Sequence, residues 1–231
     1  MSNIWLFGHH AVKAALAAKK RPFQQLLVTK QNEQAYKQLA QQSGVKMQTV
    51  DRKKLDNMSQ QPHQGVALEA GNLPQTHLKD LYDTDLLLAL DQVTDPHNVG
   101  ACLRSANAFG CGAVLLPNTH SPKDSPIIAK AAAGAMEETP LVTVSNLAQA
   151  LENLKKEGFW IVGLDGHTDQ NLADIDLGGK IVLVMGSEGE GLRDLVKKKC
   201  DFIAKLPMQG TVESLNVSVA AGIALYEARR G

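Results

Sequence analysis

The chain has 231 residues, of which 44% are hydrophobic and 21% charged, and its 24 Lys and Arg balance its 24 Asp and Glu. This composition is typical of a globular protein and excludes a disordered chain. No apolar run approaches the roughly 18 residues of a membrane span, and no signal peptide is expected at the N-terminus, so we expect a cytoplasmic protein without membrane contact. Cys102, Cys111 and Cys200 form no CxxC pair, and their odd number argues against a disulfide framework.

The charges are unevenly distributed along the chain. Residues 1–70 carry ten Lys or Arg and four Asp or Glu, a net charge of +6, so the remainder carries −6. Such an asymmetry is typical of a cation-rich part attached to a different kind of domain. Two solvated surfaces with a chance imbalance would give the same numbers, so both interpretations stay open at this point.

The first 70 residues alternate helices and strands. Asp51 is expected to cap a short basic helix that starts at Arg52. Residues 71–80 have the Gly, Pro and polar content of a linker. We therefore expect a small α/β domain over residues 1–70, joined by this linker to a second domain over residues 81–231. The other elements expected in the first domain are helices at 11–18 and 32–42 and strands at 25–29, 46–50 and 65–70.

A second alternation fills the rest of the chain. Strands of continuous apolar character, separated by helices, indicate a parallel sheet covered on both faces. Ligands of such sheets bind beyond the carboxyl ends of the strands. The expected strands are 86–90, 113–116, 141–144, 160–164, 181–185 and 202–205, and the expected helices are 99–109, 125–133, 147–156, 192–199 and 214–230.

The first polar cluster follows the strand at 86–90. It contains Asn98, a competent helix N-cap, and Arg104 six positions later. Taken alone, a capped helix whose arginine reaches a surface carboxylate explains this cluster. The density of polar groups at a strand–helix junction is what indicates a site.

The second cluster is the glycine-rich stretch from Gly186 to Leu192. It lacks the lysine of a P-loop, and its glycines do not follow the order of GxGxxG. Glu188 and Glu190 would also repel a pyrophosphate at a helix N-terminus. These carboxylates suit hydroxyls, amides or a cation, so neither NAD nor ATP is expected here.

The third cluster precedes the last helix. Ser214 is expected to cap that helix, with Asn216 and Ser218 in or beside its first turn, and three such side chains exceed what one cap requires. The seven histidines show no HExxH spacing, so no metal site is expected. Ser214 has no GxSxG setting, which argues against a hydrolase triad.

The three clusters together resemble the three motifs of the SpoU (TrmH) family of RNA ribose 2′-O-methyltransferases. The matching residues are Asn98 with Arg104, Gly186 with Glu188, and Ser214-Leu215-Asn216. Gly8-His9-His10-Ala11-Val12 and His63-Gln64-Gly65-Val66 are similar to members that carry an L30e-like RNA-binding domain and modify 23S rRNA.

The resemblance covers nearly the whole chain. It implies an L30e-like N-terminal domain and a SPOUT domain with a C-terminal trefoil knot, an exception to the usual absence of knots. It also implies S-adenosylmethionine as the cofactor, and a homodimer with the site at the interface.

The resemblance implies roles for individual residues. Gly186, Leu206 and Leu215 would bind the cofactor through backbone atoms and apolar contact. Arg104 would clamp phosphate and hydroxyl, because a guanidinium loses its proton only above roughly pH 12 and makes a poor base. Asn98 would position the arginine or the ribose.

The remaining candidate site residues would order the site or contact RNA. Glu188, Ser214 and Asn216 would order the site, and the general base stays unassigned. Arg52, Lys53 and Lys54 are the candidate RNA-contacting residues. Glu213 departs from the family pattern, because relatives commonly carry a small residue immediately before Ser214.

Three functions remain open at this point. The leading hypothesis is a methyltransferase that acts on a guanosine of 23S rRNA. The same reaction on tRNA is an alternative, although the basic N-terminal domain is absent from many minimal tRNA-acting relatives. A non-catalytic RNA-binding protein on the same fold is disfavoured because Asn98, Arg104, Glu188, Ser214 and Asn216 are all present.

Overall fold

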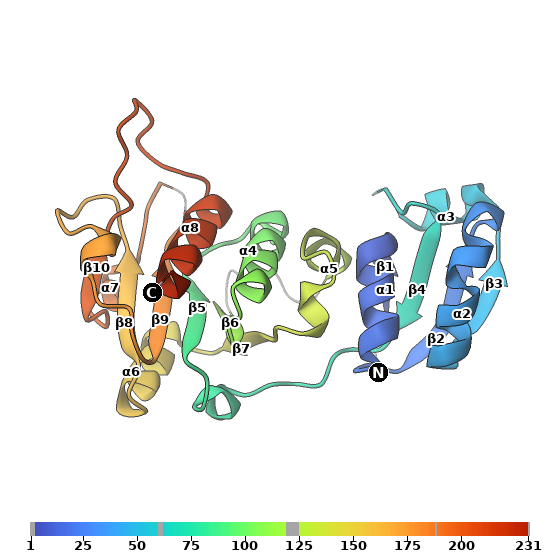
Figure 1. The fold of residues 1–231 in the computed structure, drawn as a ribbon, viewed down its shortest axis with the longest axis horizontal. Helices are drawn as coiled ribbons and strands as arrows, with labels where there is room; N and C mark the ends of the chain where they lie inside the picture. The colour runs from blue at the N-terminus through green and yellow to red at the C-terminus, as the bar shows by residue number, and fades with distance from the viewer. Residues whose placement is uncertain (1–2, 60–61, 119–124, 188, 231) are drawn as a thin grey trace. The chain divides into compact units, whose positions relative to one another are not determined.

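The computed structural model describes residues 3–59, 62–118, 125–187 and 189–230, which form two compact units (Figure 1). Within the described residues, the first unit comprises 3–75 with 125–138, and the second comprises 76–118 with 139–230. The sequence assigns 125–138 to the second domain, whereas the structure packs this segment on the first helix and first strand of the chain. No helix among the described residues is long and apolar enough to cross a bilayer.

The first unit is built on a four-stranded sheet with the order β1-β4-β2-β3. Strand β4 is antiparallel to both of its neighbours, and β2 is parallel to β3. The elements are β1 (Ile4–Phe7), α1 (His9–Ala18), β2 (Phe23–Val28), η1 (Lys30–Asn32), α2 (Glu33–Ser43), β3 (Lys46–Thr49), α3 (Arg52–Met58), β4 (Val66–Ala70), α5 (Pro126–Ala131) and η3 (Ala135–Glu137). Strand β1 is absent from the expected elements, although its sequence IWLF is entirely apolar.

A buried ion pair holds the later segment to this unit. Arg21 and Glu137 are both almost fully buried, and Arg21 Nη2 lies 2.8 Å from Glu137 Oε1. Gly134, with φ +95°, lies so close to Ala14 that a Cβ atom at position 134 would collide with it. The segment 125–138 is therefore part of the packed core of the first unit.

Helix α3 packs on the sheet through Leu55 and the partly buried Met58. Leu55 is fully buried against Phe7, Leu27 and Ala67. Asp51 is the N-cap residue of this helix, as expected, but its side chain makes no cap hydrogen bond. Helix α3 is therefore anchored by apolar packing, which leaves its basic first turn exposed.

The second unit is a six-stranded parallel sheet with the order β10-β8-β9-β5-β6-β7. The sequence-based expectation of a parallel α/β sheet is confirmed. The elements are η2 (Leu78–Leu81), β5 (Leu86–Leu90), α4 (Pro96–Ala108), β6 (Ala113–Pro117), β7 (Leu141–Val144), α6 (Leu147–Lys156), β8 (Trp160–Leu164), η4 (Leu172–Asp174), β9 (Ile181–Met185), α7 (Asp194–Lys197), β10 (Phe202–Ala204) and α8 (Val217–Arg229).

Helices cover both faces of this sheet, as the continuous apolar strands require. Alternate strand residues such as Leu87, Leu115 and Val182 face a core completed by α6 and α7. Helices α4 and α8 lie side by side and contact β6 and β9 (Figure 1). Arg229, near the end of α8, forms a bidentate ion pair with Asp85 at 2.7 and 2.9 Å.

In the second unit, three helices begin at other residues than expected. Helix α4 is capped by Asp95, not Asn98: the carboxylate accepts from His97 N at 2.9 Å, and Pro96 takes the first helical position. Helix α8 begins at Val217, because Asn216 has extended backbone angles and caps it. Helix α7 covers only residues 194–197. The N–H of the preceding Arg193 donates to the side chain of Asp91, directly after β5, and so does not continue a helix.

Candidate active site

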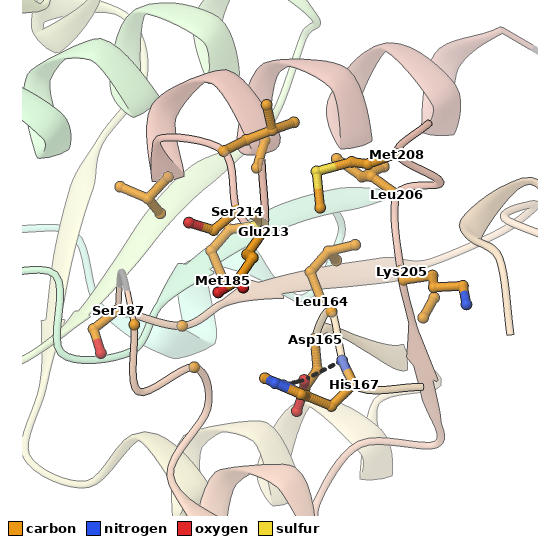
Figure 2. A pocket seen from close by; sticks show the side chains of 18 residues that line it. Leu164, Asp165, His167, Met185, Ser187, Lys205, Leu206, Met208, Glu213 and Ser214 are labelled. Atoms are coloured by element: carbon orange, nitrogen blue, oxygen red, sulfur yellow. Dashed lines mark hydrogen bonds and ion pairs between the residues drawn. The ribbon is translucent and has the colours of Figure 1, made fainter. Parts of the chain in front are cut away.

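A cavity of about 290 Å³ lies at the carboxyl edge of the six-stranded sheet (Figure 2). The ends of β8, β9 and β10 and the segment before α8 form its walls. The carboxyl ends of parallel strands meet at one edge, so segments far apart in sequence converge here. The cavity is lined by Leu164, Asp165, Gly166, His167, Met185, Gly186, Ser187, Gly189, Gly191, Ala204, Lys205, Leu206, Met208, Glu213, Ser214, Leu215, Val217 and Ala220.

The glycine-rich loop presents backbone to this cavity. Ser187 and Gly191 exchange both backbone hydrogen bonds at 3.1 Å, which folds the loop back on itself. A Cβ atom at position 186 would collide with the carbonyl group of Gly191 and with Leu192 N. Only glycine fits at Gly186, so main-chain atoms are the groups offered to a ligand there.

Apolar side chains form the opposite walls. Leu206, Met208 and Leu215 are partly accessible and line the cavity, and Leu164 closes it from the end of β8 (Figure 2). The structure thus brings Gly186, Leu206 and Leu215 to one cavity, together with Ser214. Walls of backbone and apolar surface suit a nucleoside, not a pyrophosphate.

An ion pair lies at the end of β8. Asp165 accepts hydrogen bonds from Lys197 Nζ at 2.6 Å, from His167 N at 2.9 Å and from His167 Nδ1 at 3.1 Å. Burial acts to raise the pKa of Asp165, but the hydrogen bonds from Lys197 and His167 outweigh it and hold the pKa below its usual value. Asp165 therefore stays ionised, with its charge balanced by Lys197.

The first and third sequence clusters meet beside the cavity. Asn216 Nδ2 donates to Asn98 Oδ1 at 3.0 Å, which joins the start of α8 to the first turn of α4. Neither side chain lines the cavity. This contact connects two expected site residues that lie 118 positions apart.

One expected site residue, Arg104, lies away from the cavity, and another cannot be placed. Arg104 is exposed on α4, does not line the cavity and makes no hydrogen bond or ion pair with another described residue. Glu188 lies outside the described residues, so its expected role has no structural account here.

An ion pair between the exposed Arg193 and the buried Asp91 is absent from the sequence-based expectations. Asp91 is fully buried at the end of β5, where it accepts from Arg193 Nε at 2.8 Å and Arg193 N at 3.0 Å. Arg193 Nη2 lies 2.6 Å from the same carboxylate. A charged residue directly after an all-apolar strand is the signal that could have indicated this pair, because buried charges need partners.

The basic helix belongs to the first unit. Arg52, Lys53 and Lys54 are exposed on α3, and Arg52 Nε lies 4.0 Å from Asp56 Oδ1. Asp56 Oδ1 also lies 2.8 Å from Nε2 of the buried His63. Among the described residues, no group of three His, Cys, Asp or Glu is arranged to hold a metal ion.

Comparison with known proteins decides the family. The model of the SpoU rRNA Methylase family matches residues 85–226, which include all three clusters. The chain belongs to this family. A second model, RNA 2′-O ribose methyltransferase substrate binding, matches residues 5–76. The resemblance seen in the three clusters is therefore confirmed, and the protein is a SpoU-family methyltransferase.

Curated relatives cover the same length. A 23S rRNA (guanosine-2′-O-)-methyltransferase RlmB of Coxiella burnetii is 44% identical over 97% of this chain and 94% of its own. A protein of the same name from Pseudomonas aeruginosa is 43% identical over 97% of this chain and 95% of its own. The similarity to these SpoU-family proteins thus includes both units.

Solved structures show the same fold. The crystal structure of an RNA 2′-O ribose methyltransferase matches with a TM-score of 0.82 and 26% identity, over 99% of this chain and 88% of its own. The SpoU methyltransferase AviRb from Streptomyces viridochromogenes, in complex with AdoMet, matches with a TM-score of 0.85 and 23% identity, over 99% and 89%. An A. aeolicus TrmH/SpoU tRNA modifying enzyme covers only 66% of this chain and 81% of its own, with a TM-score of 0.58 and 31% identity.

Proposed function

We propose that this SpoU-family enzyme transfers a methyl group from S-adenosylmethionine to the ribose 2′-hydroxyl of a guanosine in 23S rRNA. The observation that carries the proposal is the cavity in which Gly186, Leu206, Ser214 and Leu215 converge at the carboxyl edge of the sheet. The full-length similarity to proteins named as 23S rRNA guanosine methyltransferases supports this substrate.

The residues of the cavity fit this cofactor. Backbone at Gly186 and the apolar side chains of Leu206 and Leu215 would hold an adenosine, and no phosphate-binding group is required. When bound, S-adenosylmethionine supplies an electrophilic methyl group on a positively charged sulfur. Carboxylates in the walls suit that charge, whereas they would repel a nucleotide phosphate.

The chain's own residues would position the ribose. The Asn98–Asn216 hydrogen bond fixes the start of α4 against the start of α8, so both segments keep one geometry beside the cavity. Ser214 lines the cavity, and we assign Ser214, Asn216 and Glu188 to ordering the site. Arg104, exposed and without a described partner, is assigned to binding an RNA phosphate and the reacting hydroxyl.

The reaction balances without a further reactant. Transfer would form a bond from the 2′-oxygen to the methyl carbon and leave the electron pair of the broken C–S bond on sulfur, and the hydroxyl proton would pass to solvent water. A ribose hydroxyl is a weak nucleophile, so its proton must be drawn off as the bond forms. Orientation of the two reacting groups supplies much of the rate enhancement.

The first unit is assigned to RNA binding. Arg52, Lys53 and Lys54 lie exposed on α3, in the part of the chain with a net charge of +6. Lys and Arg side chains that neutralise phosphates release counterions and so supply affinity for RNA. With this assignment, the first unit binds RNA and the second unit binds the cofactor.

We also propose that the enzyme acts as a homodimer through α8. Val219, Ile223 and Tyr226 are 51%, 43% and 54% exposed, and with Phe109 and Ser105 of α4 they line one apolar surface. Apolar side chains at this helical spacing form a continuous stripe that favours a second apolar surface. Because the resembling family consists of homodimers, we assign this surface to contact with a second copy of the chain. A substrate in ribosomal RNA also implies that the enzyme is cytoplasmic.

Methyl transfer from labelled S-adenosylmethionine tests the function directly. Protein-free 23S rRNA and bulk tRNA, both unmodified, are offered in separate reactions. Label in 23S rRNA at one guanosine ribose is the expected result. Label in tRNA alone would show that tRNA, not 23S rRNA, is the substrate. Failure to bind the cofactor would contradict the whole proposal.

A further inference from the structure

Glu213 is a carboxylate inside the cofactor cavity. It lies in the segment before α8 and lines the cavity next to Ser214. Figure 2 shows its side chain extending from that segment into the cavity, toward the end of β9. Glu213 makes no hydrogen bond or ion pair with another residue that the structure describes. The residue is solvent-exposed where it lines the cavity, so its carboxylate is accessible to a cation bound there.

The other charges of the cavity do not balance Glu213. Asp165 is already paired with Lys197 at 2.6 Å, and His167 contacts that same carboxylate. Lys205 lies on the opposite side of the cavity from Glu213 (Figure 2), with no ion pair between them. An unbalanced negative charge is therefore left on the side of the cavity formed by the segment before α8.

We propose that Glu213 makes the cavity selective for the positively charged methyl donor over the uncharged product. This inference rests on the proposed function. Transfer converts the sulfonium into a neutral thioether, so the attraction to Glu213 exists before the reaction and is lost after it. Glu213 thus favours binding of the donor and release of S-adenosylhomocysteine, without contact to the RNA.

The size of the effect follows from Coulomb's law. A cation about 6 Å from a carboxylate, at an effective dielectric constant of about 40, gains about tenfold in affinity. The α-ammonium and α-carboxylate groups are common to donor and product. Attraction of Glu213 to those shared groups would change the affinities for S-adenosylmethionine and S-adenosylhomocysteine equally. The ratio of these two affinities therefore reports only the effect of the charge on sulfur.

Calorimetric titration of the full-length protein tests the inference. The probes are S-adenosylmethionine, S-adenosylhomocysteine and sinefungin, which carries an amine where the donor carries its methylated sulfur. Glu213→Gln is expected to weaken binding of the two charged probes about tenfold at low salt and to change binding of S-adenosylhomocysteine less than twofold. Glu213→Asp should retain most of the preference.

A matched control removes the same charge nearby. Glu190 belongs to the glycine-rich loop but does not line the cavity, so Glu190→Gln should leave all three affinities within twofold. Equal weakening of all three probes by Glu213→Gln, or no weakening, would overturn the inference. If the wild-type protein bound none of the probes, the proposed function itself would be contradicted. That outcome differs from the two results that would overturn only the role of Glu213.

Discussion

Asn216 Nδ2 donates a hydrogen bond to Asn98 Oδ1 at 3.0 Å, across 118 positions of sequence. The same Asn216 accepts from Ser218 N at 3.0 Å through its Oδ1 and so caps α8. The side-chain amide of Asn216 therefore makes two contacts. Its oxygen caps α8, and its nitrogen donates to the first turn of α4. These contacts can be separated by substitution.

We expect Asn216→Ala and Asn216→Asp to differ in stability but not in activity. Alanine loses the cap and should reduce the free energy of unfolding by about 1–2 kcal/mol, whereas aspartate keeps the accepting oxygen and should cost less than about 0.5 kcal/mol. Both lose the donor to Asn98, so single-turnover methyl transfer should fall at least tenfold in each. Full transfer by Asn216→Asp would show that this hydrogen bond is not needed.

Gly186→Ala is expected to abolish cofactor binding. The new methyl group collides with the backbone of Gly191 and Leu192, so the loop must move away from the cavity. We expect affinity for S-adenosylmethionine to fall more than tenfold and stability to fall by about 1–3 kcal/mol. Gly166 also lines the cavity but has open space at its Cβ position, so Gly166→Ala is the control and should leave affinity within threefold.

Arg104→Ala should remove methyl transfer and leave cofactor binding nearly intact. Arg104 is exposed and does not line the cavity, so its loss cannot disturb the cofactor walls. The measurements are transfer to 23S rRNA and calorimetric affinity for S-adenosylmethionine. Equal loss of both would contradict the assignment of Arg104 to the RNA side.

Alanine at both Lys53 and Lys54 should weaken RNA binding and reduce its salt dependence. Loss of two phosphate contacts lowers the slope of log affinity against log salt concentration by about 1.4–1.8. Because Leu55 anchors the helix, stability should change little. The control pair Lys37→Ala and Lys46→Ala removes the same charge from α2 and β3, and an equal effect there would show that α3 has no special role.

Asp165 should stabilise the fold in a pH-dependent manner. Its pKa is lower in the folded protein than usual, so its contribution is present above the unfolded-state pKa of about 3.9 and is lost as the pH falls through the folded-state pKa. Urea unfolding of the wild type and Asp165→Asn should therefore differ most at neutral pH, and the difference should shrink as the pH falls below the unfolded-state pKa. A difference that stays constant with pH would contradict the Asp165–Lys197 pairing.

Apolar periodicity predicted most of the strands and the fold class. The strands at 86–90, 160–164 and 181–185 have the expected bounds, because burial on both faces requires unbroken apolar runs. The edge strand at 141–144 also has its expected bounds, although only Val142 is buried in it. Helix starts were less predictable. Asn98 and Ser214 are both competent caps, but Asp95 and Asn216 have the extended backbone angles and the accepting side-chain oxygens that cap the two helices.

The sequence by itself determined the family and the parallel sheet, because local patterns and motif order encode them, and it predicted Gly186, Leu206, Ser214 and Leu215 as site residues. The trefoil knot and the homodimer stay predictions. Only the tertiary structure decided that these residues share one cavity, that Asn98 bonds to Asn216, and that Asp91 is neutralised by Arg193. Such contacts join residues about a hundred positions apart or more, and only the packing of the sheet and its helices brings them within hydrogen-bonding distance.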